Sequence, residues 1–300
     1  MSVPGIPVPV AGQPAAVRGA AAGRAMLRFV SALPASGRLG LALVVFWLLV
    51  AIFGPWLAPH EVGAMVSQDV FDPVSTRFPL GSDYLGRDML SRLLYGSRFT
   101  VGLAFAAALL ASTTGITLAL FAAVSSRWID EVTSRLMDTL ISIPSKIFAL
   151  VIVAAFGSAV PLLLVMAAIT YVPGAFRIAR ALATNVNAMD FVQAARARGE
   201  GGVYVARAEI LPNMIHPMLA DFGVRFLFIV LLLSGLSFLG LGVQPPHADL
   251  GSLVRENMSG LTEAAPAVIA PALAIATLTI GVNLLIDALP GSRRNVTEHG

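Results

Sequence analysis

The chain of 300 residues has the composition of an integral membrane protein. Hydrophobic side chains make up 57% of it and charged side chains only 12%, about half the charged share of an ordinary soluble domain. The sequence has no cysteine, which excludes disulfides, thiolate metal sites and cysteine nucleophiles. The net charge of +3 comes almost entirely from arginine, and nothing in the composition indicates a nucleic-acid partner.

The N-terminal region divides into a polar arm and a first membrane span. Residues 1–38 join a run rich in Pro, Ala and Gly to four arginines, a composition that cannot bury a core and predicts a flexible basic arm. Residues 39–59 carry no charge and are long enough for a transmembrane helix. A cleaved secretory signal is the alternative, but its apolar part would be shorter, so we expect this helix to be retained.

The polar region of residues 60–98 ends in a segment with helical spacing. Its apolar residues recur every three or four positions, while Arg87 and Arg92 take other faces. Ser82 or Asp83 can cap the start of such a helix. We therefore expect an amphipathic helix that lies along the membrane interface and packs on its neighbours, which fits this pattern better than a ligand site does.

One long apolar region must turn back within the membrane. Residues 139–176 hold a single charge, Lys146, and as one helix would extend roughly 57 Å at about 1.5 Å per residue, nearly twice the hydrocarbon thickness. We expect a tight turn at Gly157-Ser158, which divides the region into two spans. The prediction is an all-α membrane protein with six transmembrane helices, at residues 39–59, 99–126, 139–156, 159–176, 218–242 and 264–286.

The distribution of arginine predicts which side of the membrane each loop faces. If the N-terminus is cytoplasmic, the cytoplasmic regions hold thirteen arginines and the outer regions five. Because positive residues concentrate on the cytoplasmic side, we expect both termini in the cytoplasm and residues 60–98 outside.

Residues 187–213 form a polar, arginine-bearing insert on the predicted cytoplasmic side. We expect a short helix over residues 188–198, whose Ala194 and Ala195 present a small face to a partner, and a second short helix that Pro212 ends. Positive φ in the intervening turn is expected of three glycines, Gly199, Gly201 and Gly202. From these residues alone, a docking lever and a hairpin without a partner fit equally well.

The insert resembles the EAA loop of permease subunits from ATP-binding cassette importers. That loop has Glu-Ala-Ala, a Gly four residues on and a later Leu-Pro, and it marks the coupling helices that enter a groove on the ATPase. Here Gln193 stands in place of the acidic residue, and the remaining positions match. The resemblance implies an ATPase contact made by Gln193, Ala194, Ala195, Arg196, Arg198, Gly199, Ile210, Leu211 and Pro212.

Further motifs make the chain similar to the second permease subunit of dipeptide, oligopeptide and nickel importers. The matching segments extend over roughly residues 75–290 and lie at residues 80–88, 135–138, 210–213 and 236–246. Two departures stand out. Leu233 and Ser234 replace the Glu-Ala common in relatives, and Pro290 stands near the end of the sixth span, where an arginine is customary.

The resemblance implies the type I importer permease fold, with a core over residues 99–288, a cytoplasmic tail over residues 289–300 and a place in the bacterial cytoplasmic (inner) membrane. It implies a heterodimer with a second permease subunit, two ATPase subunits, and an extracytoplasmic substrate-binding protein that delivers a peptide-like or other small solute. The partner subunits would bind ATP. No catalytic residue or cofactor is expected in this chain, since it lacks a phosphate-binding loop of the form G-x-x-x-x-G-K-[ST].

A few polar groups fall within the predicted spans. Lys146 and Asn283 are candidates for the transport pathway, although snorkelling to the membrane surface and helix packing are the simpler roles. Asp221 and Arg225 are four positions apart and should pair on one helix face, with Arg225 reaching back to the headgroups. The histidines are scattered, so no metal site is expected.

Two other classes of function are weaker matches. A secondary transporter or a channel subunit without an ATPase partner is the alternative, but the six unequal spans show no inverted repeat. A membrane enzyme would need a clustered set of acid, base or nucleophile, and the sequence has none.

Overall fold

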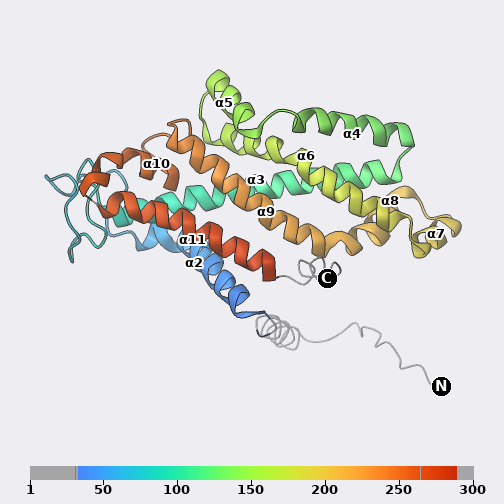
Figure 1. The fold of residues 1–300 in the computed structure, drawn as a ribbon, viewed down its shortest axis with the longest axis horizontal. Helices are drawn as coiled ribbons and strands as arrows, with labels where there is room; N and C mark the ends of the chain where they lie inside the picture. Colours follow the sequence, from blue (N-terminus) through green and yellow to red (C-terminus); the bar gives the residue numbers. More distant parts are fainter. Residues whose placement is uncertain (1–30, 32, 264, 289–300) are drawn as a thin grey trace, which may run out of the picture.

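The computed structural model describes residues 31, 33–263 and 265–288, and every named element among them is helical (Figure 1). The predicted arm at residues 1–38 lies mostly outside the described residues, and the predicted tail at residues 289–300 lies wholly outside them. The helices are α2 (Ala35–Leu57), α3 (Met89–Val124), α4 (Arg127–Ile141), α5 (Ser145–Phe156), α6 (Val160–Asn187), α7 (Asp190–Ala197), α8 (Gly202–Tyr204), the π-helical η1 (Val205–Ile210), α9 (Leu211–Phe238), α10 (Leu250–Glu256), the 3₁₀-helical η2 (Met258–Glu263) and α11 (Pro266–Ala288).

The described residues contain five helical runs that are long and apolar enough to cross a membrane. They are α2, α3, α6, the run from α8 through α9, and α11. α4 and α5 pass the same test as a pair, bent by 80°. Counting this pair as one broken span gives the six spans that the sequence predicts.

The third span differs from the single helix predicted at residues 139–156. α4 ends three residues before Pro144, and α5 begins immediately after it. Proline has no N–H to donate and disfavours helical geometry in the residue before it, so the helix breaks there. The turn after this span is confirmed: α5 ends at Phe156, and Gly157 has a positive φ of 84°.

The amphipathic segment before the second span belongs to α3 itself. α3 begins at Met89, after an N-cap in which the Asp88 side chain accepts a hydrogen bond from the Ser91 N–H at 3.0 Å. No proline interrupts the chain from there into the membrane, so the helix continues without a break. The expected separate interfacial helix, with a cap at Ser82 or Asp83, is therefore wrong.

The fifth span is longer than predicted and begins inside the polar insert. α8, η1 and α9 form one run over residues 202–238. Pro212 does not end a helix: the Leu211 N–H donates to the Ala206 carbonyl oxygen, a π-type bond that shifts the register before the proline. Pro212 is the second residue of α9 and follows this change of register directly.

Small side chains bring the spans close together. α3 and α6 make the most extensive helix contact, and fully buried alanines line it from both sides. At Gly115 of α3, a Cβ atom would lie only 2.4 Å from the Ala175 Cβ of α6. Helices in a membrane gain little from the hydrophobic effect, so this close packing is what holds them together.

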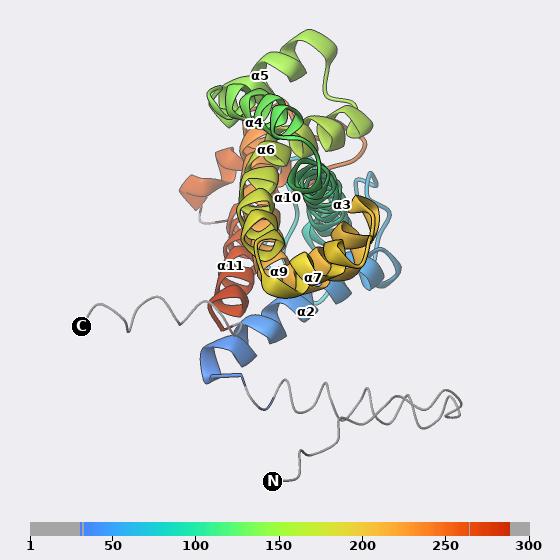
Figure 2. The same cartoon turned by 90° about the vertical axis from the view of Figure 1, so that its right-hand side faces the viewer.

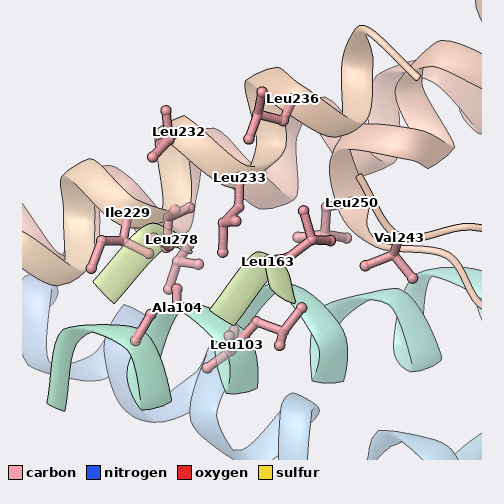
Figure 3. Close-up of a cluster of buried hydrophobic side chains, with 14 of the residues drawn as sticks. Leu103, Ala104, Leu163, Ile229, Leu232, Leu233, Leu236, Val243, Leu250 and Leu278 are labelled. Atoms are coloured by element: carbon pink, nitrogen blue, oxygen red, sulfur yellow. The ribbon is translucent and has the colours of Figure 1, made fainter. Parts of the chain in front are cut away.

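Larger aliphatic side chains fill the half of the bundle nearer α10 (Figure 3). Leu232, Leu233 and Leu236 of α9 gather over Leu103 of α3 and Leu163 of α6. The space between these spans is therefore a packed core over this half.

A polar network closes the end of the bundle opposite α7 (Figure 1). Asp83 accepts hydrogen bonds from Arg92 and from Arg87, each at 2.7 Å. Glu256 of α10 accepts from the same two guanidiniums, at 2.9 Å and 3.2 Å. These four side chains are buried or nearly so, and they fasten the segment before α3 to α10.

The segment between the predicted fifth and sixth spans contains two short helices, α10 and η2. Asp249 caps α10, accepting the Ser252 N–H at 2.8 Å, and its own N–H donates to the Ser252 Oγ at 2.9 Å. Burial raises the pKa of the Asp249 carboxyl, and hydrogen bonds from Ser237 and Ser252 act in the opposite direction. This carboxyl serves as a structural cap.

We predict that Gly115→Ala lowers the free energy of unfolding by about 1–3 kcal/mol, because the added methyl group would overlap Ala175 and the backbone of Phe176. Thermal unfolding in detergent measures the change. Gly102→Ala, on the same helix, is the control: its Cβ would meet nothing within 4 Å, so alanine should be neutral or slightly stabilising there. Equal melting temperatures for the two variants would contradict the prediction.

Candidate functional site

α7 lies across one end of the helix bundle (Figure 2). It has two faces: Val192 and Ala195 are fully buried against the neighbouring spans, while Ala194 is exposed. The expectation that both alanines face a partner therefore holds for Ala194 and is wrong for Ala195, because adjacent residues on a helix point about 100° apart. Ala195 fastens α7 to the bundle, and Ala194 is free to meet a partner.

Three polar side chains tie α7 to the end of α6. Gln193 Nε2 donates to the Asn187 carbonyl oxygen at 3.0 Å, and Arg196 Nη2 donates to the Asn187 Oδ1 at 2.8 Å. The Asn187 amide in turn donates to the Ala123 carbonyl oxygen of α3 at 3.1 Å. The bond from Gln193 requires a donor, which an ionised glutamate is not. The glutamine therefore adds a contact that the acidic residue of the EAA pattern could not make.

Gly199 makes the turn that follows α7. Its φ is +85°, and its N–H donates to the Arg196 carbonyl oxygen at 2.9 Å. This confirms the predicted positive φ at Gly199. The prediction is wrong for Gly201, which caps α8 with a φ of −74°, and for Gly202, which begins that helix. A longer contact of 3.9 Å joins Arg198 to Glu209 of η1. The turn is thus held on both sides by short helices.

The remaining residues predicted for the ATPase contact lie at different depths. Ile210 is fully buried, Leu211 is half-buried and Pro212 is exposed. The structure adds two exposed apolar residues beside the turn that the sequence reasoning passed over, Val203 at 72% and Tyr204 at 46% exposure. The sequence does hold a signal for these two residues: they are large and apolar, and they directly follow a glycine run in a polar insert.

A second feature is a groove of about 490 Å³ between the break of α4 and α5, α6 and α9. Arg225 lies in its wall and forms a double hydrogen bond with Asp221: Nε to Oδ2 at 2.6 Å and Nη2 to Oδ1 at 2.8 Å. This confirms the predicted pairing. Arg225 does not reach back to the headgroups, however, because it is 6% exposed and its Nη1 donates to the Tyr171 carbonyl oxygen of α6 at 3.1 Å.

A glycine of α6 packs against Arg225. A Cβ atom at Gly174 would lie 2.8 Å from the Arg225 Nη1, so a larger residue there would make the end of the Arg225 side chain shift. Arg177, at the rim of the groove, pairs with Asp138 of α4 at 2.6 Å. The sequence reasoning missed these α6 residues, because their relation to Arg225 depends on how two distant helices pack.

Lys146 and Asn283, the two predicted pathway candidates, are both exposed and are not among the residues that line this groove. Lys146 is in the first turn of α5, next to Ser145, which does line it. Among the described residues, no group of His, Asp or Glu side chains is arranged to hold a metal ion.

The described residues form a bundle of apolar spans with a short helix packed across one end. Residues 115–294 match the family model described as "Binding-protein-dependent transport system inner membrane component". The chain belongs to this family and is a permease subunit of a binding-protein-dependent importer. The all-α importer permease fold and the family resemblance predicted from the motifs are confirmed.

Several relatives are similar over most of their length. The Di/tripeptide transport system permease protein DppC of Pseudomonas aeruginosa is 32% identical over 83% of this chain and 84% of the relative. The Dipeptide transport system permease protein DppC of Alkalihalophilus pseudofirmus is 30% identical over 83% and 82%. The Glutathione transport system permease protein GsiD of Pectobacterium atrosepticum is 30% identical over 82% of each chain.

Among solved structures, the chain is similar to the crystal structure of an amino acid ABC transporter with histidines. The TM-score is 0.47 at 21% identity, and the match covers 66% of this chain and 91% of that chain.

We predict that Arg225→Met lowers the free energy of unfolding by about 3–5 kcal/mol, because it leaves the buried Asp221 carboxylate without a partner. Removing both charges, in Asp221→Leu with Arg225→Met, should recover most of this loss. Thermal unfolding of the single and double variants in detergent gives the coupling between the two side chains. If the change in the free energy of unfolding of the double variant equals the sum of the changes in the two single variants, the pairing is contradicted.

Proposed function

We propose that this chain forms half of the translocation pathway of an ATP-driven importer for peptides or similar small solutes. A second permease subunit would form the other half, and a separate binding protein would deliver the solute. Three relatives support the solute class, since their names assign them to the transport of dipeptides, di- and tripeptides, and glutathione. The observation that carries the ATPase contact is α7, which is held rigidly on its inner face and exposed on its outer face.

The exposed face fits a docking element. Ala194 permits close approach, Val203 and Tyr204 supply apolar surface, and Arg196 and Arg198 add positive charge nearby. Two ATPase subunits would bind and hydrolyse ATP, one of them on this surface, and the chain itself would hold no cofactor. A secondary transporter or channel subunit has no specific observation in its favour.

We infer that the α7 end of the bundle faces the cytoplasm, with both termini on that side. The arginines at this end support the orientation, because positive residues concentrate in cytoplasmic loops. They include Arg196 in the last turn of α7, Arg198 directly after α7, and Arg207 of η1, which packs on α7. The membrane would be the bacterial cytoplasmic membrane.

The test is reconstitution. In lipid vesicles that contain the chain with its partner permease and ATPase pair, addition of the binding protein and ATP should drive uptake of dipeptides. The chain alone should show neither ATP hydrolysis nor uptake. Uptake by the chain alone, driven by an ion gradient, would refute the importer in favour of a secondary transporter.

We predict that Gly199→Leu uncouples ATP hydrolysis from uptake. At a φ of +85° a side chain costs roughly 1–2 kcal/mol, so the turn after α7 should change conformation and move the docking surface. Nothing lies within 4 Å of a Cβ at this position, so the spans should stay folded. The measurement is the number of solutes transported per ATP hydrolysed in the reconstituted complex.

Gly201→Leu is the matched control for this prediction. Gly201 lies two residues away, has equally open surroundings and a φ of −74°, which any residue adopts. It should transport normally. The prediction fails if Gly199→Leu keeps normal coupling, or if both variants lose it to the same extent.

A further inference from the structure

The groove beside Arg225 has the features of a binding site that packing alone does not require. A charged pair in a membrane span is costly, and two apolar residues of the same size would often pack there with equal or greater stability. Here the pair forms part of the wall of a groove of about 490 Å³, within the usual size range of small-molecule sites. The Arg225 Nη1 packs against Gly174, 2.8 Å from where a Cβ atom would lie.

The guanidinium of Arg225 retains donors for a ligand. Of its five N–H groups, two bind Asp221 and one binds the Tyr171 carbonyl. The remaining two belong to the two terminal nitrogens, one on each, and no acceptor for them occurs in the part of the chain that the structure describes. Each of these two N–H groups can donate to a carboxylate oxygen.

The break in the third span provides a second favourable contact for an anion. α5 begins at this groove: Pro144 and Ser145 both line it, and no side chain caps the helix start. The first N–H groups of a helix have no partner within it and carry partial positive charge. Transporters use such broken helices to hold the anionic group of a solute.

The site as a whole is electrically balanced. Arg225 is neutralised by Asp221, and Arg177 at the rim is neutralised by Asp138. A balanced site favours a ligand that is itself balanced, with a carboxylate near Arg225 and an ammonium near the free lone pairs of Asp221. The rest of the lining is largely apolar, including Leu140 and Phe228, and suits aliphatic side chains.

We propose that this groove is a subsite of the transport pathway that binds the zwitterionic form of a short peptide, its carboxylate on Arg225 and the start of α5 and its ammonium on Asp221. The proposal rests on the proposed function, because it makes the groove part of the pathway. It assigns a selective step to the permease itself, in addition to selection by the binding protein.

The absence of cysteine from the chain allows a direct test. Val224→Cys places one thiol on the groove wall, next to Arg225 on α9, where the native side chain is 38% exposed. Leu231→Cys is the control: it is on the same helix, 46% exposed and not part of the groove lining. The assembled complex is treated with a small thiol reagent, without binding protein, and modification is read from the mass of this subunit.

Dialanine should slow the modification of Val224→Cys and leave Leu231→Cys unaffected. At a concentration ten times its dissociation constant, a site that excludes the reagent when occupied reacts about tenfold more slowly. N-acetyl-dialanine amide, which has the same chain without charged ends, should give no slowing. Equal protection by both compounds, or no reaction of Val224→Cys with the reagent, would overturn the proposal.

The same assay separates the site from its alternatives. Adding Asp221→Leu and Arg225→Met to Val224→Cys should abolish protection by dialanine, whereas protection that survives would show that the pair is not the binding group. In nanodiscs, slowing by phosphatidylethanolamine but not by dialanine would assign the groove to a lipid headgroup and overturn the proposal.

The outcomes distinguish a failure of the subsite proposal from a failure of the proposed importer function. Normal ATP-driven uptake without dialanine protection would remove only the subsite. If dialanine slows the modification of Val224→Cys in a chain that binds no ATPase, the subsite proposal stands and the proposed importer function is refuted.

Discussion

The close approach of α3 and α6 is the contact on which the other features depend. Gly115 lets the two helices meet at a distance that any side chain would prevent. Inside a bilayer this contact has to come from shape, since water does not drive the helices together. α6 in turn supports both regions for which we propose a function: its Tyr171 carbonyl holds Arg225, and its terminal Asn187 holds α7. Moving α6 away from α3 would disturb the groove and the docking surface together.

Much of this fold follows from hydropathy and from residue types with a fixed backbone preference. The uncharged segments predicted the spans, and Gly157 predicted the turn between the two halves of the long apolar region. The four-residue spacing predicted the pairing of Asp221 with Arg225. Each of these depends on neighbours in the sequence. The ion pair, for example, forms within one turn of a single helix, whatever the rest of the chain does.

Pro144 and Pro212 show the limit of predictions made from neighbours in the sequence. Pro144 ends a helix as a local rule predicts, whereas Pro212 lies inside a continuous helical run. The difference is the π-helical turn before Pro212, which shifts the hydrogen-bond register by one residue. Its formation depends on η1 packing against α3, α6 and α7, with Val205 and Ile210 buried in that contact. The inward turn of Ala195 and the packing of Gly174 against Arg225 are tertiary effects of the same kind.

The π-helical turn also bears on how the two functional regions communicate. α7 packs on η1, and η1 continues into α9, which carries Arg225 on the groove wall. No loop separates η1 from the groove wall, and Pro217 is inside α9 between them. From outside its own helix turn, Arg225 is held by the Tyr171 carbonyl of α6, the helix whose terminal Asn187 binds α7. A displacement of α7 relative to α3 would therefore act on Arg225 from two sides, through its own helix and through the carbonyl that it binds.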